Sequence, residues 1–113
     1  MIETILTASG IPFRQGRYPD PPAKTYAVYF DNQEIDSPDQ VEPVAAWGFP
    51  LIVHHGAEVE LYEPKPDPDA EAALEAELTT RGIPWTKQDR YWLQNVQRYQ
   101  VIYEFSYIEK RRA

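Results

Sequence analysis

The chain uses the same short phrase twice, as Gly10-Ile11-Pro12-Phe13 and as Gly82-Ile83-Pro84-Trp85. Each copy follows a segment with helical spacing, and each is followed within a few residues by Arg-Tyr. A glycine after a helix adopts the left-handed conformation that closes the last turn, and a proline then prevents the helix from continuing. The aromatic residue begins an extended segment. The phrase therefore predicts two helix-to-strand joints, and it contains no catalytic group.

The segment 67–81 has the clearest helical pattern in the chain. Asp67 is a good N-cap, and Pro68 stands at the first helical position, where proline is favoured. The expected apolar stripe consists of Ala70, Ala73, Leu74 and Leu78. Residues 2–9 form a shorter helix by the same reasoning.

The remaining regular segments have the alternation of strands. We expect strands over 11–18, 25–31, 83–92 and 98–108. Residues 25–31 are apolar on both faces, which is typical of a central strand. Residues 49–63 form either one long strand or a hairpin about Gly56. This order predicts an α+β fold in a single domain, 1–113, with a mainly antiparallel sheet of about five or six strands and two helices packed on it.

Two segments fall outside this pattern. Residues 32–48 read as a long insertion with prolines, and its apolar side chains predict an ordered excursion that docks on a neighbour. Residues 109–113 contain Lys110, Arg111 and Arg112, which we interpret as a short solvated basic tail.

Composition excludes several classes of function. The net charge is −7, and no basic stripe interrupts it, so the chain is a poor candidate for binding duplex nucleic acid. The absence of cysteine excludes disulfides and thiolate metal sites and fits a reducing cytoplasm. The sequence has neither the start of a signal peptide nor an apolar run of about 18 residues, so no membrane segment is expected.

No set of residues points to catalysis. His54 and His55 are adjacent and therefore point to opposite faces of a strand, so we expect surface or edge histidines and no metal site. The carboxylates follow the pattern of solvated surfaces, on a helix at Asp67, Asp69, Glu71 and Glu75 and on a strand at Glu58 and Glu60. The serines lack a nucleophile motif. We therefore expect no enzyme, no catalytic residue and no cofactor.

The aromatic content favours an assembly protein. Eight tyrosines, four phenylalanines and three tryptophans exceed what one small core holds, and tyrosine and tryptophan are common at protein interfaces. We expect contacts between subunits, or with a partner, at Trp47 and Phe49 in the insertion and at Tyr18 and Asp20 at the proline turn.

Several short motifs together resemble a known family. They are the Gly-Ile-Pro joint, a proline-rich turn before Tyr29–Asn32, the run Val59–Tyr62 followed by Lys65-x-Asp67, and the closing segment Tyr99–Phe105. The chain resembles the small head–tail joining and tail terminator proteins (also described as tail completion or minor structural proteins) of long-tailed bacteriophages and prophages. The stretch from Ser37 to Gly56 departs from that pattern.

The resemblance implies a ring-forming structural protein of the virion, expected as a hexamer. Its partners would be further copies of itself, the tail tube protein and the head-completion protein. It would be assembled in the cytoplasm of the host bacterium, without cofactor or membrane. DNA would pass through the ring without specific binding, because anionic walls repel phosphates. The expected lumen-facing carboxylates are Glu58 and Glu60 on a strand, or Asp69 and Glu71 on the acidic helix.

Two other interpretations stay open. An acidic binding module could inhibit a partner by imitating nucleic acid, but its carboxylates would have to lie on one face, and here Lys65, Lys87, Arg90 and Arg98 are interleaved with them. A small enzyme of unknown type is the third interpretation, and it lacks a recognisable nucleophile, base or metal set.

Overall fold

A computed structural model describes residues 1–35 and 50–112 of the chain. The elements are α1 (Ile2–Ser9), β1 (Phe13–Gln15), β2 (Tyr26–Ile35), β3 (Pro50–Glu63), α2 (Pro68–Thr80), β4 (Trp85–Lys87), β5 (Tyr91–Leu93) and β6 (Arg98–Arg112). Two helices and a mostly antiparallel sheet of six strands confirm the predicted α+β fold. No helix of the described part of the chain is long and apolar enough to cross a membrane.

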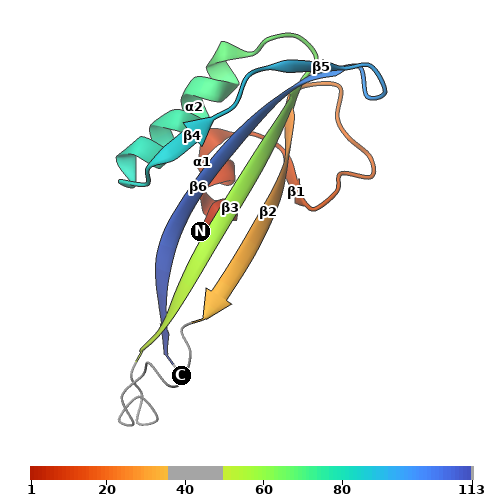
Figure 1. Cartoon of the computed structure of the whole chain (residues 1–113). Helices are drawn as coiled ribbons and strands as arrows, with labels where there is room; N and C mark the ends of the chain where they lie inside the picture. The colour runs from red at the N-terminus through yellow and green to blue at the C-terminus, as the bar shows by residue number, and fades with distance from the viewer. Residues whose placement is uncertain (36–49, 113) are drawn as a thin grey trace.

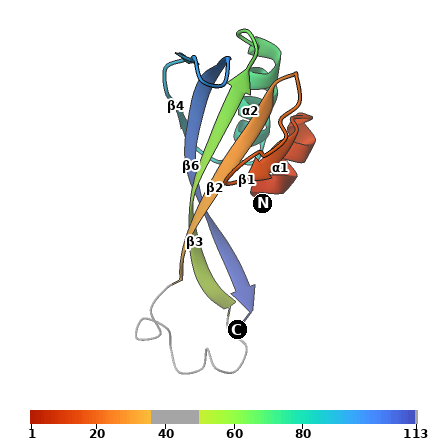
Figure 2. The same cartoon turned by 90° about the vertical axis from the view of Figure 1, so that its right-hand side faces the viewer.

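The strands lie in the order β1-β2-β3-β6-β4, and β5 also pairs with β6. Only β1 and β2 run parallel to each other, and every other pairing is antiparallel. The long strands β2, β3 and β6 cross the whole molecule, and both helices cover the same face of the sheet (Figures 1 and 2). Because β2 lies between β1 and β3, its predicted central position is confirmed.

Both Gly-Ile-Pro joints perform the same task, as predicted. Gly10 and Gly82 have φ values of 74° and 70°, in the left-handed region that favours glycine. The N–H of Ile11 then donates to the Leu6 carbonyl at 3.3 Å, and the N–H of Ile83 donates to the Leu78 carbonyl at 2.9 Å. Both isoleucines are buried in the core. Each joint thus caps a helix, adds a side chain to the core and directs the chain into an edge strand.

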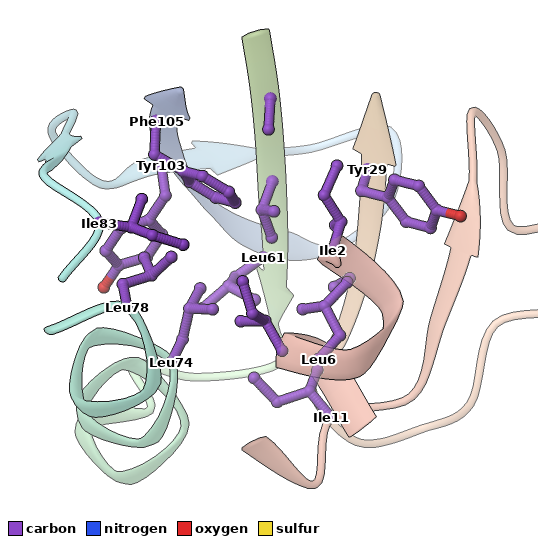
Figure 3. Close-up of a cluster of buried hydrophobic side chains, with 14 of the residues drawn as sticks. Ile2, Leu6, Ile11, Tyr29, Leu61, Leu74, Leu78, Ile83, Tyr103 and Phe105 are labelled. Carbon is purple, nitrogen blue, oxygen red and sulfur yellow. The ribbon is translucent and has the colours of Figure 1, made fainter. Parts of the chain in front are cut away.

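The core lies between the helices and the covered face of the sheet. Leucines of α1 and α2 point toward the side chains of β3 and β6, with Leu61 and Tyr103 among the fully buried residues (Figure 3). The predicted stripe of α2 is confirmed at Leu74 and Leu78, which are fully buried. The N-cap at Asp67 is also confirmed, because its carboxylate accepts the N–H of Ala70 at 3.1 Å.

Part of the sheet extends beyond the helices (Figures 1 and 2). Edge strand β1 reaches only to Tyr29 of β2, and β4 reaches only to Phe105 of β6. The three long strands continue past both points. We call this continuation, residues 31–35, 50–56 and 106–112, the arm, and the rest of the described chain the body.

Several predicted boundaries are wrong, because pairing between distant segments overrides local pattern. The expected tail 109–113 is strand as far as Arg112, paired with Pro50–Val53. The expected insertion begins later, because 32–35 belong to β2; its residues 36–48 lie outside the described chain.

The other differences concern strand lengths. Of the expected segment 49–63, residues 50–63 form the single strand β3, without a hairpin at Gly56, because β2 and β6 pair with it on both sides; residue 49 lies outside the described chain. The expected strand 83–92 divides into β4 and β5. Strand β1 is shorter than 11–18 because Gly16, with φ 73°, ends it.

Candidate interaction site on the sheet

The face of the sheet turned away from the helices carries an acidic cluster, formed by Glu58, Glu60 and Glu104. Glu58 and Glu104 are direct cross-strand partners, and Glu60 is two residues along β3 on the same face. Burial raises the pKa of Glu58, and the charges of Glu60 and Glu104 raise it further. Like charges directly opposite each other destabilise a sheet. The fold therefore maintains a negative surface at this place against an electrostatic cost.

Neutral side chains hold two of these carboxylates. The Tyr62 hydroxyl donates to Glu60 at 2.7 Å, and the Gln88 amide donates to Glu104 at 2.8 Å. Burial and the hydrogen bond to Glu60 raise the pKa of Tyr62 to about 12. These partners orient the carboxylates without neutralising them. The cluster can therefore repel phosphates or attract cations.

The arm exposes the two outer strands of the sheet. Within the described residues, β2 past Tyr29 and β6 past Phe105 each have one partner strand, β3. Two large apolar side chains of the arm are exposed, Ile35 by 52% and Ile108 by 62%. Glu34 on β2 and Lys110 on β6 are exposed as well. Uncovered strand edges with apolar side chains are templates for pairing with another chain.

A buried histidine joins the three strands of the arm. The ring of His55 is 5% exposed and stacks on Tyr107 at 4.4 Å between centroids. Its Nδ1 lies 2.9 Å from Asp31 Oδ1 of β2, and its Nε2 lies 2.7 Å from Glu109 Oε1 of β6. Each ring nitrogen thus lies within hydrogen-bond distance of a carboxylate from a different strand. This group, which we call the histidine clasp (Asp31, His55, Tyr107 and Glu109), stabilises the sheet where the helices no longer cover it.

The clasp corrects one prediction. His54 is exposed as expected, but the expectation of a surface position is wrong for His55. The signal was present in the sequence, because His55 alternates in phase with Val53, Ala57 and Val59, which are all buried. The expectation followed the residue type, histidine, and did not take this alternation into account.

An open hollow of about 790 Å³ lies beside the clasp. Its lining includes Glu3, Tyr29, His55 and Glu109. The Tyr29 hydroxyl donates to Glu3, and burial together with this bond raises the pKa of Tyr29 to about 12. The polar groups of the hollow are thus largely bonded to one another. Among residues 1–35 and 50–112, no cluster of histidine and carboxylate side chains could hold a metal ion.

A second buried network joins α2 to the sheet. Arg90 Nε lies 3.2 Å from Glu63 Oε1, and Arg90 Nη2 lies 2.5 Å from Glu71 Oε2. Lys87 Nζ lies 2.7 Å from Glu71 Oε1 and 3.0 Å from Glu75. Glu63 and Glu71 are both buried. The expectation that Glu71 belongs to a solvated surface is therefore wrong, because cations from the β4–β5 region draw its carboxylate inward.

The pKa values of the two buried carboxyl groups are shifted in opposite directions. Burial and the hydrogen bond to Glu71 raise the pKa of Glu63 to about 8, although Arg90 opposes this. Burial alone would raise the pKa of Glu71, but hydrogen bonds with Glu63, Lys87 and Arg90 lower it to about 2. Glu63 Oε2 is buried and accepts no hydrogen bond from the described residues.

Of the four residues expected to contact another subunit or a partner, the structure describes two, Tyr18 and Asp20. Trp47 and Phe49 lie outside the described residues. Tyr18 is half-buried and packs within its own subunit, with its ring 5.1 Å from Tyr26 and the Arg14 guanidinium 4.9 Å above it. Asp20 is exposed in the proline turn.

The four expected lumen-facing carboxylates do not share one surface. Glu58 and Glu60 lie together on the helix-free face, and the structure adds Glu104 to them. Asp69 and Glu71 belong to α2, on the opposite face of the sheet (Figures 1 and 2).

Neither the scan against protein families nor the search of curated proteins gives a match to this chain.

Proposed function

We propose that this protein is a structural component of a phage or prophage virion, at the tail terminus or in the head–tail neck. It acts by assembling with copies of itself into a ring that docks to the tail tube protein and the head-completion protein. It needs no cofactor and catalyses no reaction. The sequence resemblance is the origin of this proposal, and the geometry of the sheet supports it.

The arm is the observation that carries the proposal. Among residues 1–35 and 50–112, no second strand pairs with β2 past Tyr29 or with β6 past Phe105, and Ile35 and Ile108 are more than half exposed. Monomeric proteins normally shorten, charge or cover such edges. A ring subunit needs them, because each copy must offer one surface to the copy before it and another to the copy after it.

The acidic cluster gives the ring a suitable inner surface. Two pairs of carboxylates were expected to face the lumen. Of these, only Glu58 and Glu60 lie on the helix-free face of the sheet, with Glu104 beside them. The inner wall of the proposed ring is therefore the helix-free face. A negative wall repels the phosphates of passing DNA.

Light scattering coupled to size-exclusion chromatography tests the proposal. We expect a mass that is a whole multiple of 13.1 kDa and that does not change with further dilution once the ring has closed. Electron microscopy of the same fraction should show rings with the helices outside. A mass of one subunit at every concentration would contradict the proposal.

An acidic inhibitor that imitates nucleic acid is the second candidate. The cross-strand placement of Glu58 opposite Glu104, with Glu60 adjacent, favours it, because these carboxylates share one face. Such an inhibitor would stay monomeric and would compete with DNA for a basic partner. The charge-neutral variant with Gln at these three positions should then lose binding, whereas a ring subunit should still assemble.

A further inference from the structure

We propose that residues 85–93, which we call the strap, form a proton-operated device: the strap is held closed on the buried carboxyl groups of Glu63 and Glu71, and it opens when Glu63 loses its proton. The strap contains β4, β5 and the residues between them. This inference goes beyond the proposed assembly and does not depend on it, because every contact that carries it lies within one subunit.

The strap is a lightly attached part of the body. Its two strands each pair with β6 over only three residues, 85–87 in β4 and 91–93 in β5. By contrast, β3 pairs with β6 along its whole length, and α2 buries Leu74 and Leu78 in the core. Short edge segments open locally at a lower free energy than the strands and helices of a core. The strap can therefore open while the core stays folded.

Two cations fasten the strap to α2 and to the end of β3. Arg90 joins the two buried carboxyl groups, since its Nε lies 3.2 Å from Glu63 and its Nη2 lies 2.5 Å from Glu71. Lys87 joins Glu71 to Glu75. The side chain of Glu63 is 0% exposed and that of Glu71 is 4% exposed. Hydration of either carboxyl group therefore requires part of its cover to move, and the strap carries the cations that cover them.

The charges beneath the strap do not balance. In this network of described residues, three carboxyl groups (Glu63, Glu71 and Glu75) meet two cations (Lys87 and Arg90), so full ionisation leaves one negative charge in excess. Glu63 Oε2 adds to the cost, because this buried atom has no hydrogen-bond partner among the described residues. A buried carboxylate that lacks donors is strongly disfavoured, and a neutral carboxyl group much less so. Ionisation of Glu63 therefore favours a conformation in which water reaches it.

The surroundings of Glu63 agree with this assignment. The groups that face it are Glu71 of α2, Arg90 of the strap, Tyr103 of β6 and its cross-strand partner Tyr99. Burial raises the pKa of Glu63 to about 8, together with the hydrogen bond and the charge of Glu71, while Arg90 acts in the opposite direction. Glu71 stays ionised, because its hydrogen bonds outweigh its burial and lower its pKa to about 2.

The opening should follow pH with a definite sign. In the open strap Glu63 is hydrated and has its ordinary pKa of 4.5, whereas in the closed strap its pKa is about 8. The closed strap is therefore most favoured below about pH 4.5. Opening should increase by up to about tenfold per pH unit between these two values and level off above about pH 8.

Opening of the strap would also change the acidic cluster on the helix-free face. The side-chain amide of Gln88 donates to Glu104 at 2.8 Å, and the backbone N–H of Gln88 donates to the Ile102 carbonyl at 2.9 Å. Both bonds break when the strap leaves β6. Loss of a proton on the helix-covered face would thus release a carboxylate on the other face, which couples pH to the negative surface.

Amide hydrogen exchange, followed by NMR between pH 5 and 8.5, tests the strap. The quantity compared is the protection factor, the ratio of the intrinsic to the measured exchange rate, which removes the pH dependence of the exchange chemistry itself. The Gln88 amide should be less protected than the amide of Val59, in the centre of the sheet. Its protection should fall by up to about tenfold per pH unit as far as about pH 8.

Two matched variants identify the proton. Glu63→Gln should remove the pH dependence of the Gln88 protection factor, because an amide does not ionise. Glu75→Gln is the control, since it removes a carboxylate that is 27% exposed from the same network. It should lower the protection of the strap at every pH and leave the slope unchanged.

Three results would overturn the inference. One is a Gln88 protection factor that does not change with pH in the unaltered protein, and this result requires no variant to fold. Another is protection equal to that of Val59 at every pH, which would mean that the strap opens only when the whole chain unfolds. The third is a slope that persists in Glu63→Gln, which would assign the proton to a different group.

Discussion

The body and the arm are built from the same three strands, yet they are stabilised in different ways. In the body, α1 and α2 cover one face, and Val59, Leu61 and Tyr103 are fully buried there. In the arm, the same face holds the histidine clasp. Alternation along a strand therefore sets which side chains share a face. Where helices cover that face, apolar side chains such as Leu61 pack against them; past the helices, the same face carries a hydrogen-bonded histidine.

The difference separates folding from assembly. The body has an apolar core that is buried within one subunit, so the burial of that core does not depend on a partner. The arm leaves Ile35 and Ile108 exposed, so burying them requires another chain. Changes in the body should act on the free energy of unfolding, and changes on the arm should act on association.

The largest expected effect is on the body. Leu61→Ala removes a fully buried side chain and leaves a cavity, which should lower the free energy of unfolding by about 2–5 kcal/mol. The matched change on the arm, Ile108→Ala, should leave that free energy nearly unchanged and weaken association instead. Urea denaturation and light scattering measure the two quantities. Equal destabilisation by both changes would remove the distinction between body and arm.

The next effect concerns the clasp. His55→Phe keeps a stacked ring but removes the hydrogen bonds between the imidazole and the carboxylates of Asp31 and Glu109, which should cost about 1–3 kcal/mol. Hydrogen exchange should become faster in the arm while the body stays protected. His54→Phe, on the opposite face, is the control and should change exchange little. Uniformly faster exchange throughout the chain would show that arm and body unfold together.

The pair of Glu63 and Glu71 should make stability depend on pH. The pKa of Glu63 is raised to about 8, so its contribution is fully present below about pH 4.5 and is lost as pH rises through 8. The pKa of Glu71 is lowered to about 2, so its contribution is present above about pH 4.5 and is lost as pH falls through 2.

Urea denaturation between pH 5 and 8.5 should therefore show stability that falls as pH rises, by at most about 1.4 kcal/mol per pH unit for one group. The groups that face Glu63 are Glu71 on α2, Arg90 after β4, and Tyr103 on β6. Glu63→Gln should flatten this slope, because the amide cannot titrate. An unchanged slope in that variant would assign the pH dependence to other groups.

Features that depend only on a few neighbouring residues could be predicted from the sequence. The helix ends at Gly10 and Gly82 and the cap at Asp67 depend on backbone conformation and on neighbours within a turn, and all three are confirmed. Of the candidate site, the common face of Glu58 and Glu60 followed from their spacing. Glu104 could not be added, because only the pairing of β3 with β6 brings it opposite Glu58.

The sequence by itself determined the α+β class, the two helix-to-strand joints and the phase of each strand, because these depend on φ angles and periodicity within a few residues. Only the tertiary structure decided that β6 continues through Lys110 and that His55, Glu63 and Glu71 are buried. Burial and pairing depend on which distant segment comes to lie alongside. A charged or polar residue is buried when that segment supplies its partner, and its own sequence context does not contain that information.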